Sequence, residues 1–205
     1  QTWQTERLLA THDDLWRSKR FKPAMQFFID ELYGPKDFSQ RDTELAQVVP
    51  KMGRVLPNKG LISLEAALRL NSLSLELDIA LVQALGGKEI NRHSYFEGYQ
   101  QSGNQAKREQ QIQLLESLGL DLAQVVKITG ISTILMLSRK PAKIAGVKSL
   151  HEFLEKGFKS FKKLGDVHDF IDPIVSREKE LMQALFAANG QTENPLPEVV
   201  SLNSK

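Results

Sequence analysis

The sequence predicts an all-α protein, a single-domain bundle of eight or nine helices, because helical periodicity runs through most of the chain. Apolar residues recur at spacings of three and four, and no segment shows the period-two alternation of a half-buried strand. The 205 residues, 41% of them hydrophobic, suffice for one substantial core. We therefore expect a helical domain over residues 1–188 and an extended or disordered tail over residues 189–205, which contains Gly190, Pro195 and Pro197.

Glycine, proline and capping residues divide the periodic part of the chain into nine segments. Pro50 bends or ends the third segment, and the pair Gly86 and Gly87 ends the fourth. Asp172 followed by Pro173 is typical of an N-cap and a first helical position, so it predicts the start of the last helix. The expected helices cover residues 2–18, 22–33, 39–53, 59–85, 91–102, 105–128, 131–144, 147–164 and 172–188.

The best defined corner of the predicted fold contains the run FFIDELYGPKDFS, which begins at Phe27. Its apolar residues recur at helical spacing, while Asp30 and Glu31 lie between them and are expected to face water. Gly34 suits a left-handed helix stop, and the proline that follows cannot continue the helix. Ser39 then suits the N-cap of the next helix.

Residues Phe27 to Tyr33 resemble the motif that names a bacterial protein family, Phe-Phe-Leu-Glu-Glu-Leu-Tyr (FFLEELY), with isoleucine and aspartate as departures at the third and fourth positions. Residues 34–39, 157–161 and 174–181 resemble other recurrent stretches of the same family. The resemblance implies a helical bacterial protein without an established activity. It assigns no cofactor, catalytic residue or binding residue to this chain.

The sequence gives specific predictions about how three of the expected helices are buried. In the segment 59–85 the polar residues form one narrow stripe and nearly every other position is apolar, so this helix is expected at the centre of the fold. The apolar residues 128–137 span about half the length of a membrane helix and are expected in a buried helix. The segment 147–164 is two-faced, with Gly157 amid its apolar face. A glycine there costs about 1 kcal/mol of helix propensity, so another helix or a ligand should approach closely.

Composition excludes several classes of function. The 27 basic and 25 acidic residues leave a formal net charge of +2, which gives no general reason to expect a nucleic-acid partner. The absence of cysteine excludes disulfides, thiolate catalysis and sulfur-bound metals. No signal peptide and no transmembrane segment are predicted, so we expect a cytoplasmic protein. The motifs of serine hydrolases and phosphate-binding loops do not occur.

His12 lies inside the apolar face of the first helix, an unusual place for an imidazole. Either it is a core histidine satisfied by a hydrogen bond, or it ligates a haem iron. The second alternative is similar to the haem oxygenase fold, which holds its iron through a histidine on an N-terminal helix. The glycine-rich distal helix of such enzymes is not recognised in the sequence, so no cofactor is predicted and haem is kept as the alternative.

A polar seam crosses the apolar side of the segment 59–85. Asn71, Ser74 and Asp78 fall on one line of this helix, opposite its polar stripe and flanked by apolar residues. A buried carboxylate needs a cation or several donors, or its pKa rises. The seam therefore either belongs to a buried hydrogen-bond network or lines a ligand pocket.

Asp166, His168, Asp169 and Asp172 carry side chains of the kind that hard metal ions prefer. Helix capping by Asp172 and a turn at Asp166 also account for these residues. The remaining histidines show no spacing of three or four that would place two of them on one helical face. No metal site is therefore predicted.

A basic stretch extends from Arg139 to Lys163, with eight cations and two acidic residues. Lys156, Lys159 and Lys163 could meet an anionic membrane surface or a nucleic acid. Glutamates four residues before the first two of these lysines favour instead an ordinary solvated helix face. Aromatic residues do not interleave with the charges, so nucleic acid is the less favoured partner.

These observations predict a non-catalytic helical protein that binds a small molecule or another protein. Its expected binding residues are Asn71, Ser74, Asp78 and His12. One alternative is a haem- or metal-dependent enzyme of haem oxygenase-like fold that uses His12. Another is peripheral binding to an anionic membrane or nucleic acid through the basic helices.

Overall fold

The protein is built from helices alone in the part of the chain that the computed structural model describes, residues 1–34, 43, 58–188 and 193–199. This part contains nine α-helices, one π-helical turn and no strand, which confirms the expected all-α bundle. The elements are α1 (Thr2–Thr11), α2 (Asp13–Arg17), α3 (Lys22–Phe28), η1 (Ile29–Tyr33), α5 (Asn58–Leu85), α6 (Arg92–Gln101), α7 (Gln105–Val125), α8 (Ile131–Ile144), α9 (Lys148–Lys162) and α10 (His168–Ala187).

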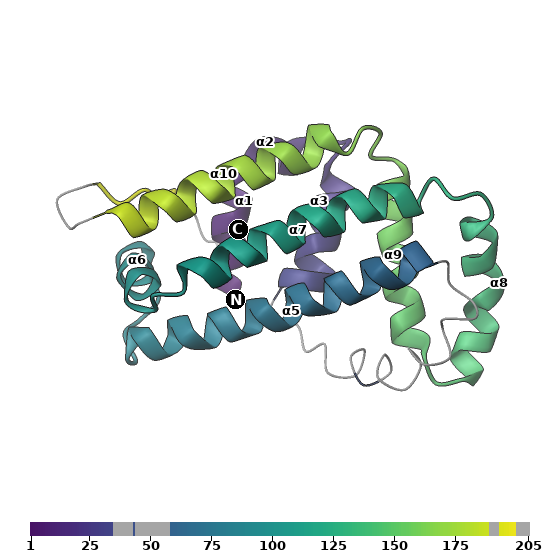
Figure 1. Ribbon diagram of the computed structural model, residues 1–205, viewed down its shortest axis with the longest axis horizontal. Helices are drawn as coiled ribbons and strands as arrows, with labels where there is room; N and C mark the ends of the chain where they lie inside the picture. Colours follow the sequence, from purple (N-terminus) through teal and green to yellow (C-terminus); the bar gives the residue numbers. More distant parts are fainter. Residues whose placement is uncertain (35–42, 44–57, 189–192, 200–205) are drawn as a thin grey trace, which may run out of the picture.

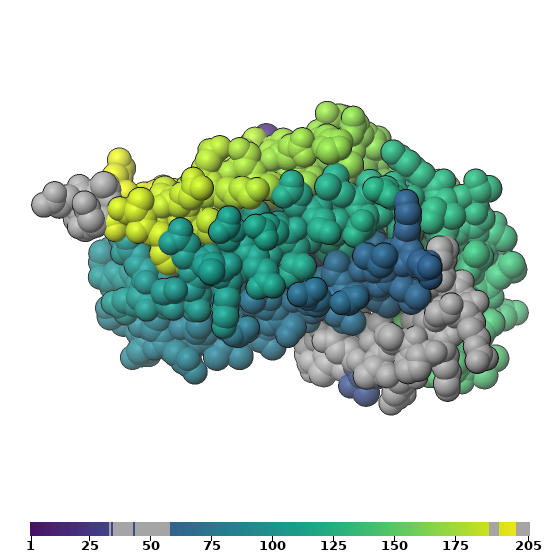
Figure 2. Space-filling model, viewed as in Figure 1, coloured from purple at the N-terminus to yellow at the C-terminus, as the bar shows by residue number. Residues whose placement is uncertain are grey.

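Three long helices, α5, α7 and α10, run side by side along the long axis of the molecule (Figure 1). The chain reverses direction from α5 to α7 and again from α7 to α10, as in up-and-down bundles. Behind this layer lie α1, α2 and α3. At one end α9 crosses the layer and carries α8, and at the other end α6 packs on α5 and α10. The same long helices form much of the face seen in the space-filling view (Figure 2).

The first two aromatic residues of the corner run, Phe27 and Phe28, anchor it to the core, as the helical spacing predicts. Phe27 and Phe28 are buried, and the ring of Phe27 lies 5.4 Å from Phe153 and 6.3 Å from Phe161, measured between centroids. A Cβ atom on Gly157 would lie 3.0 Å from the ring of Phe27. The expected close approach at Gly157 is therefore confirmed, and the partner is α3.

Gly34 ends η1, but the predicted left-handed conformation is wrong. Its φ of −73° and ψ of 167° are extended, which any residue can adopt. A Cβ atom at this position would lie 2.3 Å from the carbonyl oxygen of Ile29, so the chain needs glycine because the backbone folds back on itself. Of the next expected helix, 39–53, only residue 43 is described, so the prediction of this helix, with Ser39 and Pro50, lies outside the described residues.

Two predicted helix starts and ends also differ from the structure. The first helix is broken at His12, whose φ of −118° and ψ of 35° separate α1 from α2. The last helix begins at His168, and Pro173 lies inside it, so the prediction of Asp172 as its N-cap is wrong. The N-cap is Val167, which makes no side-chain cap, and just before it Oδ1 of Asp166 accepts a hydrogen bond from the backbone N–H of His168 at 3.0 Å.

Two helices that we expected to be buried all round expose apolar side chains. On α5, Leu75, Ile79 and Val82 are at least half exposed. On α8, Met136 and Leu137 are 57% and 67% exposed. These side chains are exposed because α5 forms one edge of the long layer, and because α8 packs mainly on α9 at one end of the molecule. An apolar pattern on most sides of a helix therefore overstated its burial here.

Candidate functional site

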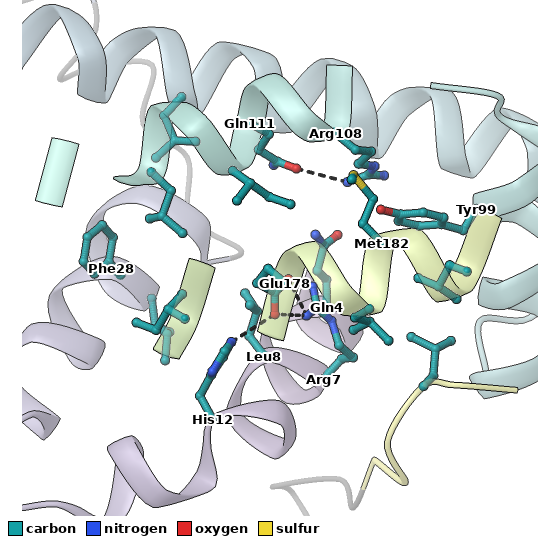
Figure 3. Close-up of a pocket in the computed structure, with 18 of the residues that line it drawn as sticks. Gln4, Arg7, Leu8, His12, Phe28, Tyr99, Arg108, Gln111, Glu178 and Met182 are labelled. Carbon is teal, nitrogen blue, oxygen red and sulfur yellow. Dashed lines mark hydrogen bonds and ion pairs between the residues drawn. The ribbon is translucent and has the colours of Figure 1, made fainter. Parts of the chain in front are cut away.

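A cavity of about 70 Å³ lies between the N-terminal helices and the long layer, with walls from α1, α6, α7 and α10. A single water needs roughly 10 to 15 Å³ by the same measure, so the space holds several waters or a small organic molecule. Most of its wall is apolar. The polar residues that matter most for its chemistry are Arg7, His12, Tyr99, Arg108, Gln111 and Glu178, and Figure 3 shows how they lie.

Glu178 on α10 is the centre of a buried ion-pair network. Arg7 donates from Nη1 to both of its carboxylate oxygens, at 2.6 and 2.8 Å. The Nε2 atom of His12 lies 2.9 Å from Oε1 of the same carboxylate. Burial acts to raise the pKa of Glu178, but the charge of Arg7 and the hydrogen bond from His12 outweigh it and hold the pKa at about 2. The carboxylate is therefore ionised at neutral pH.

Two consecutive residues of α10 fasten this helix to the N-terminal helices. Glu178 reaches inward to α1, whereas Arg177 makes a two-pronged pair with Asp14 of α2 at the surface, at 2.6 and 2.9 Å. The break of the helix at His12 matters here, because it directs the imidazole to the same carboxylate as Arg7. One wall of the cavity is thus held in place by two adjacent residues of α10, Glu178 through a buried ion pair and Arg177 through an ion pair at the surface.

Arg108 on α7 forms part of another wall of the cavity, and only 3% of its surface is exposed. Its Nη1 atom lies 3.4 Å from Oε1 of Gln111, a long hydrogen bond, and its guanidinium carbon lies 4.7 Å above the ring of Tyr99. The Nε and Nη2 atoms of Arg108 are buried without a hydrogen-bond partner in the described part of the chain. A buried guanidinium with two unused donors is energetically costly.

Few acidic groups act on Arg108. No ion pair joins it to a carboxylate among the described residues, and Glu178 is already engaged by Arg7 and His12. Asp78 acts on it only through space: burial raises the pKa of Asp78, and Arg108 opposes that rise. Burial also raises the pKa of Tyr99, so this phenol stays neutral and can donate a hydrogen bond.

The predicted polar seam on α5 is divided by the structure. Ser74 is buried and donates to the carbonyl oxygen of Leu70 at 2.7 Å. Its hydroxyl also accepts a hydrogen bond from Nε2 of Gln111 at 2.8 Å, which turns the amide oxygen of Gln111 toward Arg108. Asn71 and Asp78 are half-buried and do not line the cavity. Ser74 therefore orients Gln111 without lining the cavity itself, whereas His12 lines the cavity.

Sequence reasoning missed Arg7, Arg108, Gln111 and Glu178. A signal existed for Arg108, because Arg108 and Gln111 share one helical face with apolar residues at 112 and 115. Glu178 likewise interrupts an apolar face of α10. The sequence could not show that Arg7 pairs with Glu178, because the two residues are 171 positions apart.

As it stands, Nε2 of His12 is not available to bind iron, because it lies 2.9 Å from Oε1 of Glu178, whereas Nδ1 has no hydrogen-bond partner among the described residues. Nor do the acidic residues near 166–172 gather: Asp169 pairs with Arg20 at 2.8 Å, and Asp172 lies 3.1 Å from Nδ1 of His168. Among the described residues, no group of three or more histidine, aspartate or glutamate side chains is arranged to hold a metal ion.

Two of the three candidate surface lysines are engaged in ion pairs. Lys156 binds Glu31 at 2.7 Å, and Lys159 binds Glu155 at 2.7 Å, while Lys163 is exposed. Within the described part of the chain, no helix combines the length and apolar character that crossing a bilayer requires.

A second cavity of about 60 Å³ lies between α5, α7, α8 and α9, and its lining is almost wholly apolar. Leu122 of α7 lines it, seven residues after Leu115, which lines the first cavity. One helix face therefore borders both spaces, and only the first holds charged groups.

Comparison with known proteins gives a family but no relative of known activity. No curated protein and no solved structure matches the chain. A family model matches residues 1–192, which include every helix described above and all residues of the charged cavity except Leu196. The chain therefore belongs to the family described as a domain of unknown function, DUF8198.

Proposed function

We propose that the protein binds a small molecule, without catalysing a reaction on it, in the cavity bounded by Arg7, His12, Arg108 and Glu178. The observation that carries the proposal is Arg108, a nearly fully buried cation with two unused donors at a cavity wall. Burial of such a group is costly unless a partner of opposite charge meets it. A ligand in the cavity supplies that partner.

The fixed state of the other polar groups supports binding rather than chemistry. Glu178 is ionised and uses both oxygens on Arg7, and Gln111 is oriented by Ser74. Among the described residues that line the cavity, none is a serine or threonine that could serve as a nucleophile. Groups that are held in one protonation state and one orientation suit recognition of a ligand.

The cavity proposal can be tested by narrowing each cavity in turn. Leu115→Trp places a larger side chain in the charged cavity, and Leu122→Trp does the same in the apolar cavity on the same helix face. In ¹H–¹⁵N NMR spectra, 1-hexanol and hexanoate should shift amide signals of α1, α7 and α10. Leu115→Trp should abolish those shifts, and Leu122→Trp should keep them. Shifts that survive Leu115→Trp would contradict the assignment of the site.

A second candidate function, attachment to an anionic membrane surface, is favoured by α8 rather than by the predicted lysines of α9. Leu137, Lys140 and Ile144 recur at spacings of three and four and are all exposed. Met136 and Lys143 flank them, and α8 contains no acidic residue. An apolar helix face bordered by lysines matches the interface of an anionic bilayer.

Vesicle sedimentation separates this function from simple charge attraction. The protein should sediment with vesicles that contain phosphatidylglycerol and not with phosphatidylcholine alone. Replacing Lys140 and Lys143 by glutamine should release it, whereas the same change at Lys162 and Lys163, at the C-terminal end of α9, should have little effect. Equal effects of the two pairs, or no preference for the anionic vesicles, would refute a role of α8.

A further inference from the structure

We infer that the molecule bound in the charged cavity is a monocarboxylic acid with an apolar body, and that Nε and Nη2 of Arg108 bind its carboxylate. The inference rests on the proposed function, because it names the ligand of the same cavity. Three independent features support it: the edge of the guanidinium that is free, the balance of charge, and the character of the walls.

The two unused donors of Arg108 lie on one edge of its guanidinium. The N–H bonds of Nε and of one Nη atom point the same way, and their spacing matches the two oxygens of a carboxylate. The remaining atom, Nη1, is the one that Gln111 approaches, and Tyr99 covers one face of the group. The edge suited to a two-pronged carboxylate bond is therefore the one whose donors have no hydrogen-bond partner among the described residues.

The balance of charge in the cavity calls for one negative charge. The charge of Arg7 is balanced by Glu178, because both carboxylate oxygens of Glu178 accept hydrogen bonds from Arg7. Among the described residues Arg108 has no carboxylate partner, and Asp78, which acts on it through space, does not line the cavity. A dianion such as a phosphate monoester would bring one more negative charge than Arg108 balances into a mostly apolar space, at a high desolvation cost.

The apolar walls indicate the rest of the ligand. Next to Arg108, α7 contributes Ile112 and Leu115, and α10 contributes Leu181 and Leu185. None of these side chains can replace the hydrogen bonds that a polar ligand body would lose on leaving water. A hydrocarbon chain or ring attached to the carboxylate fits them, whereas a sugar or an amino acid zwitterion does not.

Titration calorimetry with matched acids and alcohols tests the ligand class. We expect hexanoate and phenylacetate to bind about tenfold or more tightly than 1-hexanol and 2-phenylethanol, since a hydrogen bond to a charged group is worth more than a neutral one. Arg108→Gln should remove that preference and keep the weak binding of the alcohols. Arg108→Lys should lose most of it, because an ammonium keeps the charge without the two-pronged edge. Arg177→Gln, at the surface pair with Asp14, is the matched control and should keep the preference.

The outcomes distinguish the ligand class from the site itself. If the alcohols bind as tightly as the acids, or hexyl phosphate binds more tightly than hexanoate, the monocarboxylate inference is overturned and the binding cavity stands. An unchanged preference in the folded Arg108→Gln variant, checked by circular dichroism, also overturns it. If none of these molecules binds and none shifts the NMR signals of the cavity, the proposed function fails as well.

Discussion

Replacing Glu178 by glutamine should destabilise the protein more than any comparable change at a surface ion pair. The substitution keeps the size of the side chain and removes its charge. Arg7, whose side chain is 6% exposed, then loses the carboxylate that its Nη1 atom engages. Breaking a buried pair by removing one partner costs about 3 to 5 kcal/mol because the other charge is left buried.

The pKa of Glu178 gives a similar magnitude by a different route. Its ordinary value is 4.5, and Arg7 and His12 hold it at about 2 against the effect of burial. At about 1.4 kcal/mol per pKa unit, this difference corresponds to about 3 kcal/mol of folding free energy. A lowered pKa stabilises the fold fully above the unfolded-state value near 4.5 and progressively less as the pH falls to about 2.

Urea denaturation followed by far-UV circular dichroism, at several pH values, measures this effect. At pH 7 the variant should be about 3 kcal/mol less stable than the unchanged protein. The difference should shrink between pH 4.5 and about pH 2, because a protonated Glu178 is itself neutral like glutamine. The reasoning is refuted if the two proteins differ by less than about 1 kcal/mol at pH 7, or if the same difference persists at pH 2.

Asp14→Asn is the matched control for this measurement. Arg177 lowers the pKa of Asp14 to about 2 as well, yet the side chain of Asp14 is 59% exposed. Solvent screening limits such a pair to less than about 1 kcal/mol. The two variants therefore separate the effect of burial from that of a low pKa.

Three further substitutions test the packing, and each is measured by urea denaturation at pH 7. Gly119→Ala should cost about 1 to 3 kcal/mol, because its Cβ atom would lie 2.3 Å from Ile171, and adding Ile171→Val should recover part of the loss. Asn91→Ala should cost about 1 kcal/mol, since its side chain caps α6 by accepting two backbone N–H bonds. Lys156→Ala should change stability by less than about 1 kcal/mol despite its 2.7 Å contact with Glu31, because the lysine side chain is 59% exposed. A larger loss would show that the Glu31 carboxylate, whose side chain is 12% exposed, strengthens the pair.

The helices could be predicted well because their signals are local. The periodicity of segments such as 59–85 and 131–144 places α5 and α8 to within a residue. The start of α10 was missed because Asp172 followed by Pro173 is a typical capping sequence, whereas the structure has the N-cap at Val167, which offers no capping side chain. The depth of burial of α8 was missed because periodicity identifies an apolar helix and does not say whether neighbours cover it.

The candidate site could be predicted only in part because it depends on pairs distant in the chain. His12 stood out as a polar residue on an apolar face, and the structure places it in the cavity. Ser74 stood out for the same reason, and it acts through Gln111. Arg7 has no local signal that points to Glu178, since only the packing of α1 against α10 brings the two together.

The ion pair between Arg7 and Glu178 also has a consequence for how the chain folds during synthesis. A ribosome adding roughly 5 to 20 residues per second needs about 10 to 30 seconds between the two residues, which are 171 positions apart. Throughout that interval Arg7 and His12 remain in contact with water or with chaperones, because the carboxylate that pairs with them has not yet been synthesised. The charged cavity is therefore among the last features of the nascent protein to close.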